Sequence, residues 1–197
     1  MNSLHPALLL IDFFHPHNYK GMGRIGPAAE RAARCTAVLR AHARRRGIPV
    51  IYVNDNFGDW ASNFSRLVAA CYALRSAAGN VARTLVPDGE PFVLKPRHSA
   101  FYGTPLEFLL DELGVDSLVL AGLATDACIT MTAHDAHLRK FRLWIPRDCV
   151  AASSEPISRA ALKQVARVTS ASTSPSVLGW NGIRAARIRG TKEPSGR

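Results

Sequence analysis

Short apolar runs recur along the chain, and longer stretches with helical spacing of apolar residues separate them. The runs are residues 7–11, 49–53, 92–94, 117–121 and 142–145, with a further short candidate at 171–173. Continuous apolar runs are typical of strands that are buried on both faces of a parallel sheet, whereas strands with one exposed face alternate apolar and polar residues. The pattern therefore predicts buried parallel strands.

The stretches between these runs predict helices. The first opens at Pro27 and ends at Gly47, because proline suits a first helical turn and glycine suits a helix end. Another begins with the capping-box sequence TPLE at residues 104–107 and ends at Gly114. Further helices are expected over residues 62–78, 127–140 and 156–168. Strands alternating with helices predict a three-layer α/β/α protein with a parallel sheet covered on both faces.

The composition fits one soluble domain. The chain has 197 residues, of which 47% are hydrophobic and 20% charged, enough for a sizeable core. We expect the domain to span residues 1–180, with a basic, disordered tail over residues 181–197. No apolar run approaches the roughly 18 residues of a membrane helix, so no membrane partner is expected. The N-terminal apolar run follows no basic residues and stops at Asp12, unlike a secretory signal, which favours a cytoplasmic location.

The net charge of +10 raises the alternative of a basic, non-catalytic protein that associates with nucleic acid. The excess arginine lies mainly in residues 28–46 and in the tail, where aromatic residues do not interleave with it as a single-strand binder requires. We therefore interpret the charge as a solvated face plus a tail, and expect no specific nucleic-acid partner.

Four cysteines occur without any CxxC pair, so neither a disulfide framework nor a thiol–disulfide motif is indicated. Cys35 and Cys71 lie in amphipathic helical stretches, where a thiol behaves as a small apolar group. Cys149 follows the run at 142–145 and is a rival candidate for chemistry. Cys128 is the main candidate, because it follows the run at 117–121 within the first turn of the next predicted helix.

Two more polar residues directly follow predicted strands. Asp12 follows the first strand and Lys95 the third, and ligands of open α/β sheets bind beyond the carboxyl ends of the strands. A helix N-terminus and an ammonium both favour a thiolate, and a carboxylate can accept the thiol proton and return it to a leaving amine. Asp12, Lys95 and Cys128 together therefore predict acyl-transfer chemistry, with Asp12 also deprotonating the hydrolytic water.

The loop over residues 122–127, GLATDA, contains several small residues. Small side chains let backbone N–H groups approach a substrate oxygen and stabilise a tetrahedral oxyanion. The amides of Ala124 and Cys128 are the candidates for this role.

Four segments make the chain resemble the isochorismatase-like cysteine hydrolases, which include nicotinamidases and N-carbamoylsarcosine amidohydrolases. They are ALLLIDFF, PVIYVNDNFGDW, FVLKPRHSAFYGTPLEFLL and LVLAGLATDACITMTAHDA. The resemblance implies a six-stranded parallel sheet in Rossmann-like order and a catalytic triad of Asp12, Lys95 and Cys128. It also implies a cis peptide between Leu123 and Ala124, and a homo-oligomer, dimer or tetramer, assembled through helices that flank the sheet.

The sequence also departs from the family pattern. Phe14 stands where many members have glutamine, and Asp55-Asn56-Phe57 replaces the metal-binding Asp-x-His pattern of nicotinamidases. We therefore expect no metal and no other cofactor, and His15 and His17 on their loop are more often unliganded than bound to zinc. True isochorismatases hydrolyse a vinyl ether without a cysteine nucleophile, so Cys128 favours the branch that hydrolyses amides.

These observations predict a metal-independent cysteine hydrolase that breaks a C–N bond in a small carboxamide or ureido compound through a thioester. An ether hydrolase of the isochorismatase type and a redox-active thiol protein are two further possibilities. Loops after the first three strands supply the expected substrate pocket. Its residues are Phe14, Phe57, Trp60, His98, Phe101 and Tyr102.

Overall fold

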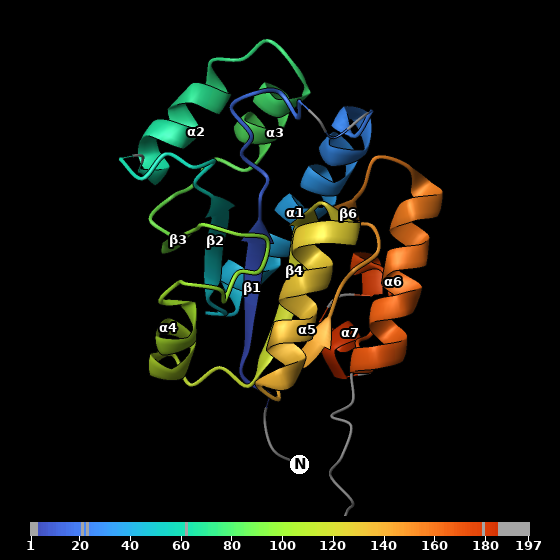
Figure 1. The fold of residues 1–197 in the computed structure, drawn as a ribbon. Helices are drawn as coiled ribbons and strands as arrows, with labels where there is room; N and C mark the ends of the chain where they lie inside the picture. Colours follow the sequence, from blue (N-terminus) through green and yellow to red (C-terminus); the bar gives the residue numbers. More distant parts are fainter. Residues whose placement is uncertain (1–3, 21, 23, 62, 179, 185–197) are drawn as a thin grey trace, which may run out of the picture.

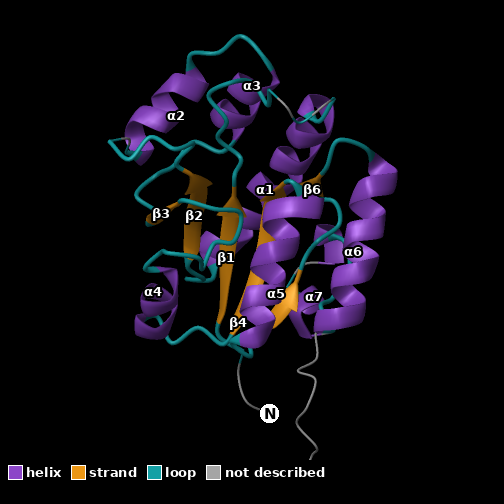
Figure 2. Cartoon of the chain, viewed as in Figure 1, coloured by secondary structure: helices purple, strands orange, loops and turns teal. Residues whose placement is uncertain are grey.

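The computed structural model describes residues 4–20, 22, 24–61, 63–178 and 180–184, and its centre is a parallel sheet with helices on both faces (Figures 1 and 2). The strands are β1 (Pro6–Ile11), β2 (Val50–Asp55), β3 (Phe92–Lys95), β4 (Ser117–Leu123), β5 (Arg142–Trp144) and β6 (Val150–Ala151). They form a six-stranded sheet in the order β3-β2-β1-β4-β5, with β6 also paired to β4. Every pairing is parallel, which confirms the predicted α/β class.

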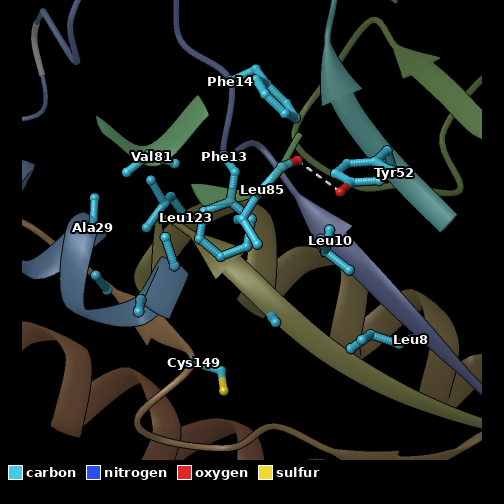
Figure 3. Packing of buried hydrophobic residues seen from close by; sticks show 14 of the residues in the cluster. Leu8, Leu10, Phe13, Phe14, Ala29, Tyr52, Val81, Leu85, Leu123 and Cys149 are labelled. Atoms are coloured by element: carbon cyan, nitrogen blue, oxygen red, sulfur yellow. Dashed lines mark hydrogen bonds between the residues drawn. The ribbon is translucent and has the colours of Figure 1, made fainter. Parts of the chain in front are cut away.

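Each face of the sheet packs against its own group of helices. One group is α1 (Gly26–Arg45), α2 (Phe64–Tyr72), α3 (Ala77–Thr84) and α7 (Asn181–Arg184), and the other is α4 (Leu106–Glu112), α5 (Thr130–Leu138) and α6 (Glu155–Thr169). The buried side chains between the sheet and the α1, α2, α3 and α7 group form the first core, and those between the sheet and the α4, α5 and α6 group form the second. Successive strand residues point to opposite faces, so Leu10 lies in the first core and Ile11 in the second. In the first core, shown in Figure 3, the Tyr52 hydroxyl donates to the Leu85 carbonyl at 2.8 Å. Burial on both faces explains why β1 is apolar throughout.

The helix predicted over residues 62–78 is in fact two helices, α2 and α3, separated at residues 73–76. The Asn63 side chain caps α2 by accepting the Arg66 N–H at 2.9 Å. At the break, a Cβ on Gly79 would lie 1.8 Å from the Leu74 carbonyl oxygen. Glycine at this position thus permits a backbone contact that apolar spacing alone does not reveal.

The sixth strand also differs from its predicted place. Residues 150–151 form β6, which pairs with the end of β4, whereas β5 pairs with its beginning. The candidate at 171–173 forms only an isolated bridge between Ser172 and Trp144. Because β6 is two residues long, no apolar run of strand length marks it in the sequence.

The residues directly after the predicted domain end at position 180 are helical. After the short 3-10 turn η2 (Ser176–Leu178), residues 181–184 form α7, and Ile183 is 3% exposed in the first core. Gly182 lies against Trp144, where a Cβ would come within 2.2 Å of the indole ring. The rest of the predicted tail, residues 185–197, falls outside the described residues. No described helix combines the length and apolar character needed to cross a membrane.

Candidate active site

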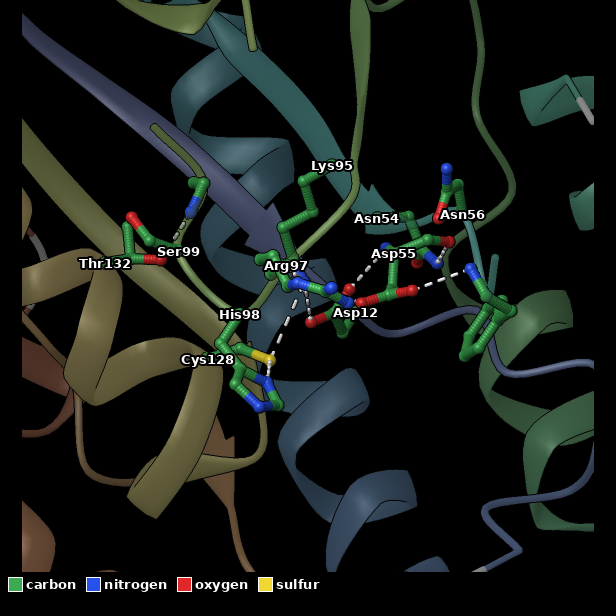
Figure 4. A network of polar contacts seen from close by, with 12 residues as sticks. Asp12, Asn54, Asp55, Asn56, Lys95, Arg97, His98, Ser99, Cys128 and Thr132 are labelled. Carbon is green, nitrogen blue, oxygen red and sulfur yellow. Dashed lines mark hydrogen bonds and ion pairs between the residues drawn. The ribbon is translucent and has the colours of Figure 1, made fainter. Parts of the chain in front are cut away.

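Three side chains from three strand ends meet at one edge of the sheet (Figure 4). Asp12 follows β1, Lys95 is the last residue of β3, and Cys128 lies in the π-helical turn η1 (Thr125–Ile129) after β4. The Lys95 Nζ is 2.8 Å from Asp12 Oδ2 and 3.6 Å from Cys128 Sγ. The fold therefore brings together three residues that are far apart in the sequence.

The backbone at Asp12 is tightly specified. Asp12 has φ of 52°, a left-handed conformation that is uncommon for a residue with a Cβ and recurs at functional sites. Its N–H donates to the Val53 carbonyl at 2.9 Å, and its Oδ1 accepts the Asp55 N–H at 2.7 Å. Just before it, β4 approaches so closely that a Cβ on Gly122 would lie 1.9 Å from the Ile11 oxygen. Neighbouring strands on both sides thus fix the carboxylate.

Lys95 is 0% exposed, and its ammonium has acceptors in several directions. Besides Asp12 and Cys128, its Nζ lies 3.1 Å from the Arg97 carbonyl oxygen and 3.5 Å from Asp55 Oδ2. A buried cation is costly unless it is paired and hydrogen-bonded. These contacts therefore keep a positive charge at a fixed place beside the sulfur.

Cys128 sits where η1 leads into α5, so the predicted helix begins with a π turn. π turns inside helices recur at functional sites. The turn is anchored by the Thr130 hydroxyl, which donates to the Thr125 carbonyl at 2.6 Å, and by a 2.9 Å hydrogen bond between the hydroxyls of Thr125 and Ser158 of α6. His98 Nδ1 lies 3.5 Å from the Cys128 sulfur. The sulfur thus has nitrogen partners from both Lys95 and His98.

Burial and neighbouring charges set the protonation of the cluster. Burial raises the pKa of Cys128, and the Asp12 charge adds to this rise while Lys95 opposes it. Burial also raises the pKa of Asp12 in spite of Lys95. For Lys95, burial acts to lower the pKa, but the charges of Asp12 and Cys128 outweigh it, and the pKa is raised. We conclude that Cys128 rests as a thiol beside an ion pair, so its proton must leave during any attack.

A cavity of about 580 Å³ opens onto this cluster. Its wall beside the sulfur includes Ala124 and Ala127, and the peptide between Leu123 and Ala124 is cis. Both alanines have only a methyl side chain at this wall, and the Ala127 N–H donates to the Ala124 carbonyl at 3.1 Å. The other residues that line the cavity are Asp12, His15, Met22, Ile25, Asp55, Phe57, His98, Leu123, Asp126, Cys128 and Ser153.

The six residues expected in the pocket wall fall into two groups. Phe57 and His98 line both this cavity and an adjoining one of about 500 Å³, which Trp60 and Tyr102 also line. The other two, Phe14 and Phe101, are buried.

Phe14 and Phe101 line neither of these two cavities and are 1% and 5% exposed. Phe14 packs against Tyr52 and Phe64, because Asn54 bonds its backbone N–H and carbonyl and turns the ring inward. Phe101 stacks on Phe141 on the opposite face of the sheet. The expectation that these two rings face the substrate is therefore corrected.

The two loop histidines lie close together, with ring centroids 5.9 Å apart. His15 accepts the Tyr19 N–H at its Nδ1 at 3.1 Å and packs edge-on against Phe57, and burial lowers its pKa. Within the described part of the chain, no three His, Cys, Asp or Glu side chains come together as metal ligands do. His15 thus borders the cavity as a packed aromatic group.

Sequence reasoning missed two features of the site. Asp55 provides a second carboxylate for Lys95, although its sequence pattern suggested only a comparison with metal ligands. His98 was expected in the pocket wall, but it also contacts the sulfur. Asp55 ends β2 at the same sheet edge, and that position is a usable signal; the contact of His98 depends on how its loop folds.

The sequence and the fold of this chain are similar to those of known proteins. Residues 6–175 match the family model of the Isochorismatase domain. The isochorismatase family protein YaaI of Bacillus subtilis is 32% identical over 169 residues, which are 85% of this chain and 92% of that protein. The maleamate amidohydrolase of Pseudomonas putida is 33% identical over 162 residues, 74% of this chain and 71% of that enzyme. The solved N-carbamoylsarcosine amidase of Thermoplasma acidophilum is 29% identical, with a TM-score of 0.68 over 88% of this chain and 97% of its own.

Proposed function

Because the chain belongs to the isochorismatase family, we propose that it hydrolyses the C–N bond of a small carboxamide or ureido compound through a thioester on Cys128. Relatives named as amidohydrolases and amidases support the reaction class. The observation that carries the proposal is the position of Lys95 Nζ, 2.8 Å from Asp12 Oδ2 and 3.6 Å from Cys128 Sγ. Nucleophile, cation and carboxylate within this range are the parts that acyl transfer requires.

In the first half of the reaction the Cys128 thiol attacks the carbonyl carbon while its proton passes to Asp12. The raised pKa of Asp12, caused by burial, makes this carboxylate a better proton acceptor than an exposed one. The S–C bond forms, the C–N bond breaks, and the proton moves from Asp12 to the leaving nitrogen. Lys95 stabilises the charge that develops on the sulfur as the proton leaves.

The carbonyl oxygen becomes negative during the attack and needs hydrogen-bond donors. The backbone amides of Ala124 and Cys128 fill this role in our proposal, since both residues line the cavity beside the sulfur. Preorganised donors of this kind contribute about 10²- to 10³-fold to the rate in other hydrolases. Water then attacks the thioester, releases the acid and restores the thiol.

The proposed reaction uses neither a metal nor another cofactor. Asp12, Lys95, Cys128 and the loop amides already supply base, cation, nucleophile and oxyanion donors. Addition of a chelator at millimolar concentration should therefore leave the rate of the purified enzyme unchanged. A rate that falls with the chelator and returns with a divalent metal would contradict this part of the proposal.

We also propose that the enzyme is a homo-oligomer, a dimer or tetramer. Large apolar side chains on the α4 and α5 layer are exposed, namely Phe108 at 76%, Met131 at 47% and Leu138 at 76%. Extended exposed apolar surfaces are typical of protein interfaces, so we place the interface on this layer. Light scattering of the purified protein would check this, and a monomer at micromolar concentration would contradict it.

The function is tested by an ammonia-release screen over small amides and ureido acids, with wild type, Cys128→Ala and Cys149→Ala run in parallel. We expect turnover by wild type and by Cys149→Ala, and none by Cys128→Ala. A substrate that wild type and Cys128→Ala turn over equally would overturn the thioester mechanism.

A further inference from the structure

His98 contacts the reactive sulfur from outside the buried ion pair. Its Nδ1 is 3.5 Å from Cys128 Sγ, and in Figure 4 the ring and the Lys95 side chain approach the sulfur from different sides. His98 is exposed, whereas Lys95 is fully buried and Asp12 is 8% exposed. The sulfur thus separates an inner carboxylate–ammonium pair from an outer imidazole.

The backbone around His98 is fastened on both sides. The Arg97 carbonyl accepts from Lys95 Nζ at 3.1 Å, and the Ala100 N–H donates to the Thr132 hydroxyl of α5 at 3.0 Å. Between them, the Ser99 hydroxyl donates to the Asp135 carboxylate. These contacts tie the loop to Lys95 and to α5, the helix that continues from Cys128. The imidazole is therefore held at the sulfur although its side chain is exposed.

We propose that His98 is a catalytic residue, the base that activates the water in thioester hydrolysis. This inference rests on the proposed function, because it requires an acyl group on Cys128. In this step His98 takes a proton from water, the hydroxide oxygen bonds to the carbonyl carbon, and the C–S bond breaks. The imidazolium then gives its proton to the departing sulfur, which it already contacts. Thiol and neutral imidazole are restored, and the substrate has gained one water.

The positions of the two bases explain why they divide the work. Asp12 is buried against Lys95. In the proposed reaction it accepts the thiol proton and passes it to the leaving nitrogen. His98 borders the active-site cavity and two adjoining cavities, the second of which is lined also by Met131 and Asp135. Because the His98 side chain is exposed, its imidazole is open to water beside the sulfur. The sequence alone favours Asp12 for both proton transfers, whereas the geometry favours His98 for the second.

p-Nitrophenyl acetate separates the two half-reactions, because its nitrophenolate leaves without needing a proton. The burst of nitrophenolate reports acylation of Cys128, and the steady-state rate reports hydrolysis of the acetyl thioester. We expect His98→Gln to keep a burst of about one equivalent and to lose about 10²-fold in the steady state. Intact-protein mass spectrometry should show that the acetylated chain, once formed, persists about 10²-fold longer in His98→Gln than in wild type.

His42→Gln is the matched control. His42 lies in the last turn of α1, about 24 Å along the helix from its start near the cavity, at 1.5 Å per residue. This variant should match wild type in both phases. A further readout is rescue: after subtraction of the ester hydrolysis that imidazole causes without enzyme, added imidazole should raise the steady-state rate of His98→Ala and leave that of wild type unchanged.

The pH profile gives an independent readout. A general base contributes to the pH dependence of the step that it assists, so the steady-state rates of wild type and His98→Gln should depend differently on pH. His134→Gln should keep the wild-type dependence. The charged and titratable groups that face His98 from its own loop, β2, the β1 loop, η1 and α5 are Asp12, His15, Asp55, Lys95, Arg97, Tyr102, Asp126, Cys128, His134 and Asp135.

The outcomes distinguish the two proposals. If Cys128→Ala keeps the burst, the thioester mechanism itself is wrong. If Cys128→Ala loses the burst but His98→Gln hydrolyses the acetyl enzyme at the wild-type rate, only the role of His98 is wrong. Equal losses in burst rate and steady state in His98→Gln, without imidazole rescue of His98→Ala, would show that His98 only supports the site and would also overturn the inference.

Discussion

Cys128 and Cys149 are both buried cysteines that follow neighbouring strands, β4 and β5, yet their surroundings differ. Cys149 is 0% exposed within the first core, and its carbonyl accepts the Gly122 N–H at 2.9 Å. Burial, followed by the charge of Asp148, raises the pKa of Cys149 to about 12. Cys128 borders an open cavity and has Lys95 at 3.6 Å.

The difference teaches that burial alone says little about the reactivity of a thiol. Burial raises the pKa of both sulfurs, so neither is a thiolate at rest. Only Cys128 has a cation, a nearby proton acceptor and room for a substrate. A thiol without these partners behaves as a small apolar group.

The largest expected effect is the loss of catalysis. Cys128→Ala should lower the rate of amide hydrolysis by about 10³-fold or more, because it removes the atom that forms the covalent intermediate. Cys149→Ala should stay within about threefold of wild type, since it touches no substrate. Comparison of kcat for the two variants checks this. Similar losses of kcat in both variants would mean that removal of either thiol disturbs the fold, and would contradict a specific chemical role of Cys128.

The next effect concerns the buried ion pair. Lys95→Met should lower the free energy of unfolding by about 3–5 kcal/mol, because it leaves the Asp12 carboxylate buried without its cation. The pKa of Asp12 should rise further, and activity should be lost with it. Urea unfolding measures the stability change. Lys163→Met, at an exposed position of α6, should be nearly neutral, and an equal loss there would contradict the argument.

A smaller effect should appear in alkaline solution. The folded-state pKa of Cys149, about 12, lies above the value of roughly 8.5 in an unfolded chain. Its contribution to stability is therefore complete below about pH 8.5 and is lost as the pH rises toward 12. Between pH 7 and 10 the wild type should lose about 2 kcal/mol through this group, and Cys149→Ala should lose correspondingly less. Identical pH dependence in the two proteins would show that the thiol does not titrate on unfolding.

The smallest effect concerns access to the two sulfurs. Iodoacetamide should modify Cys128 about tenfold faster than Cys149, because one borders a cavity and the other must wait for local opening of the core. Peptide mass spectrometry measures both rates in one sample. Faster labelling of Cys149 than of Cys128 would contradict the greater accessibility assigned to Cys128.

Much of the architecture follows from the order of apolar and polar residues. The apolar runs marked five of the six strands, since strands buried on both faces consist mainly of apolar residues. The sequence could not mark β6, which is two residues long, or the break between α2 and α3, where the close contact at Gly79 involves backbone atoms. Both features depend on what the segments pack against.

The site likewise has features that the sequence indicates and features that depend on tertiary packing. Sequence alone determined which residues stand at strand ends, and this singled out Asp12, Lys95 and Cys128, because parallel strands deliver their carboxyl ends to one edge. Only the tertiary structure decided which side chains reach the sulfur. It placed His98 against Cys128 and turned Phe14 into the core. Chain order fixes where a strand ends, whereas the direction of a loop side chain depends on contacts with residues distant in sequence.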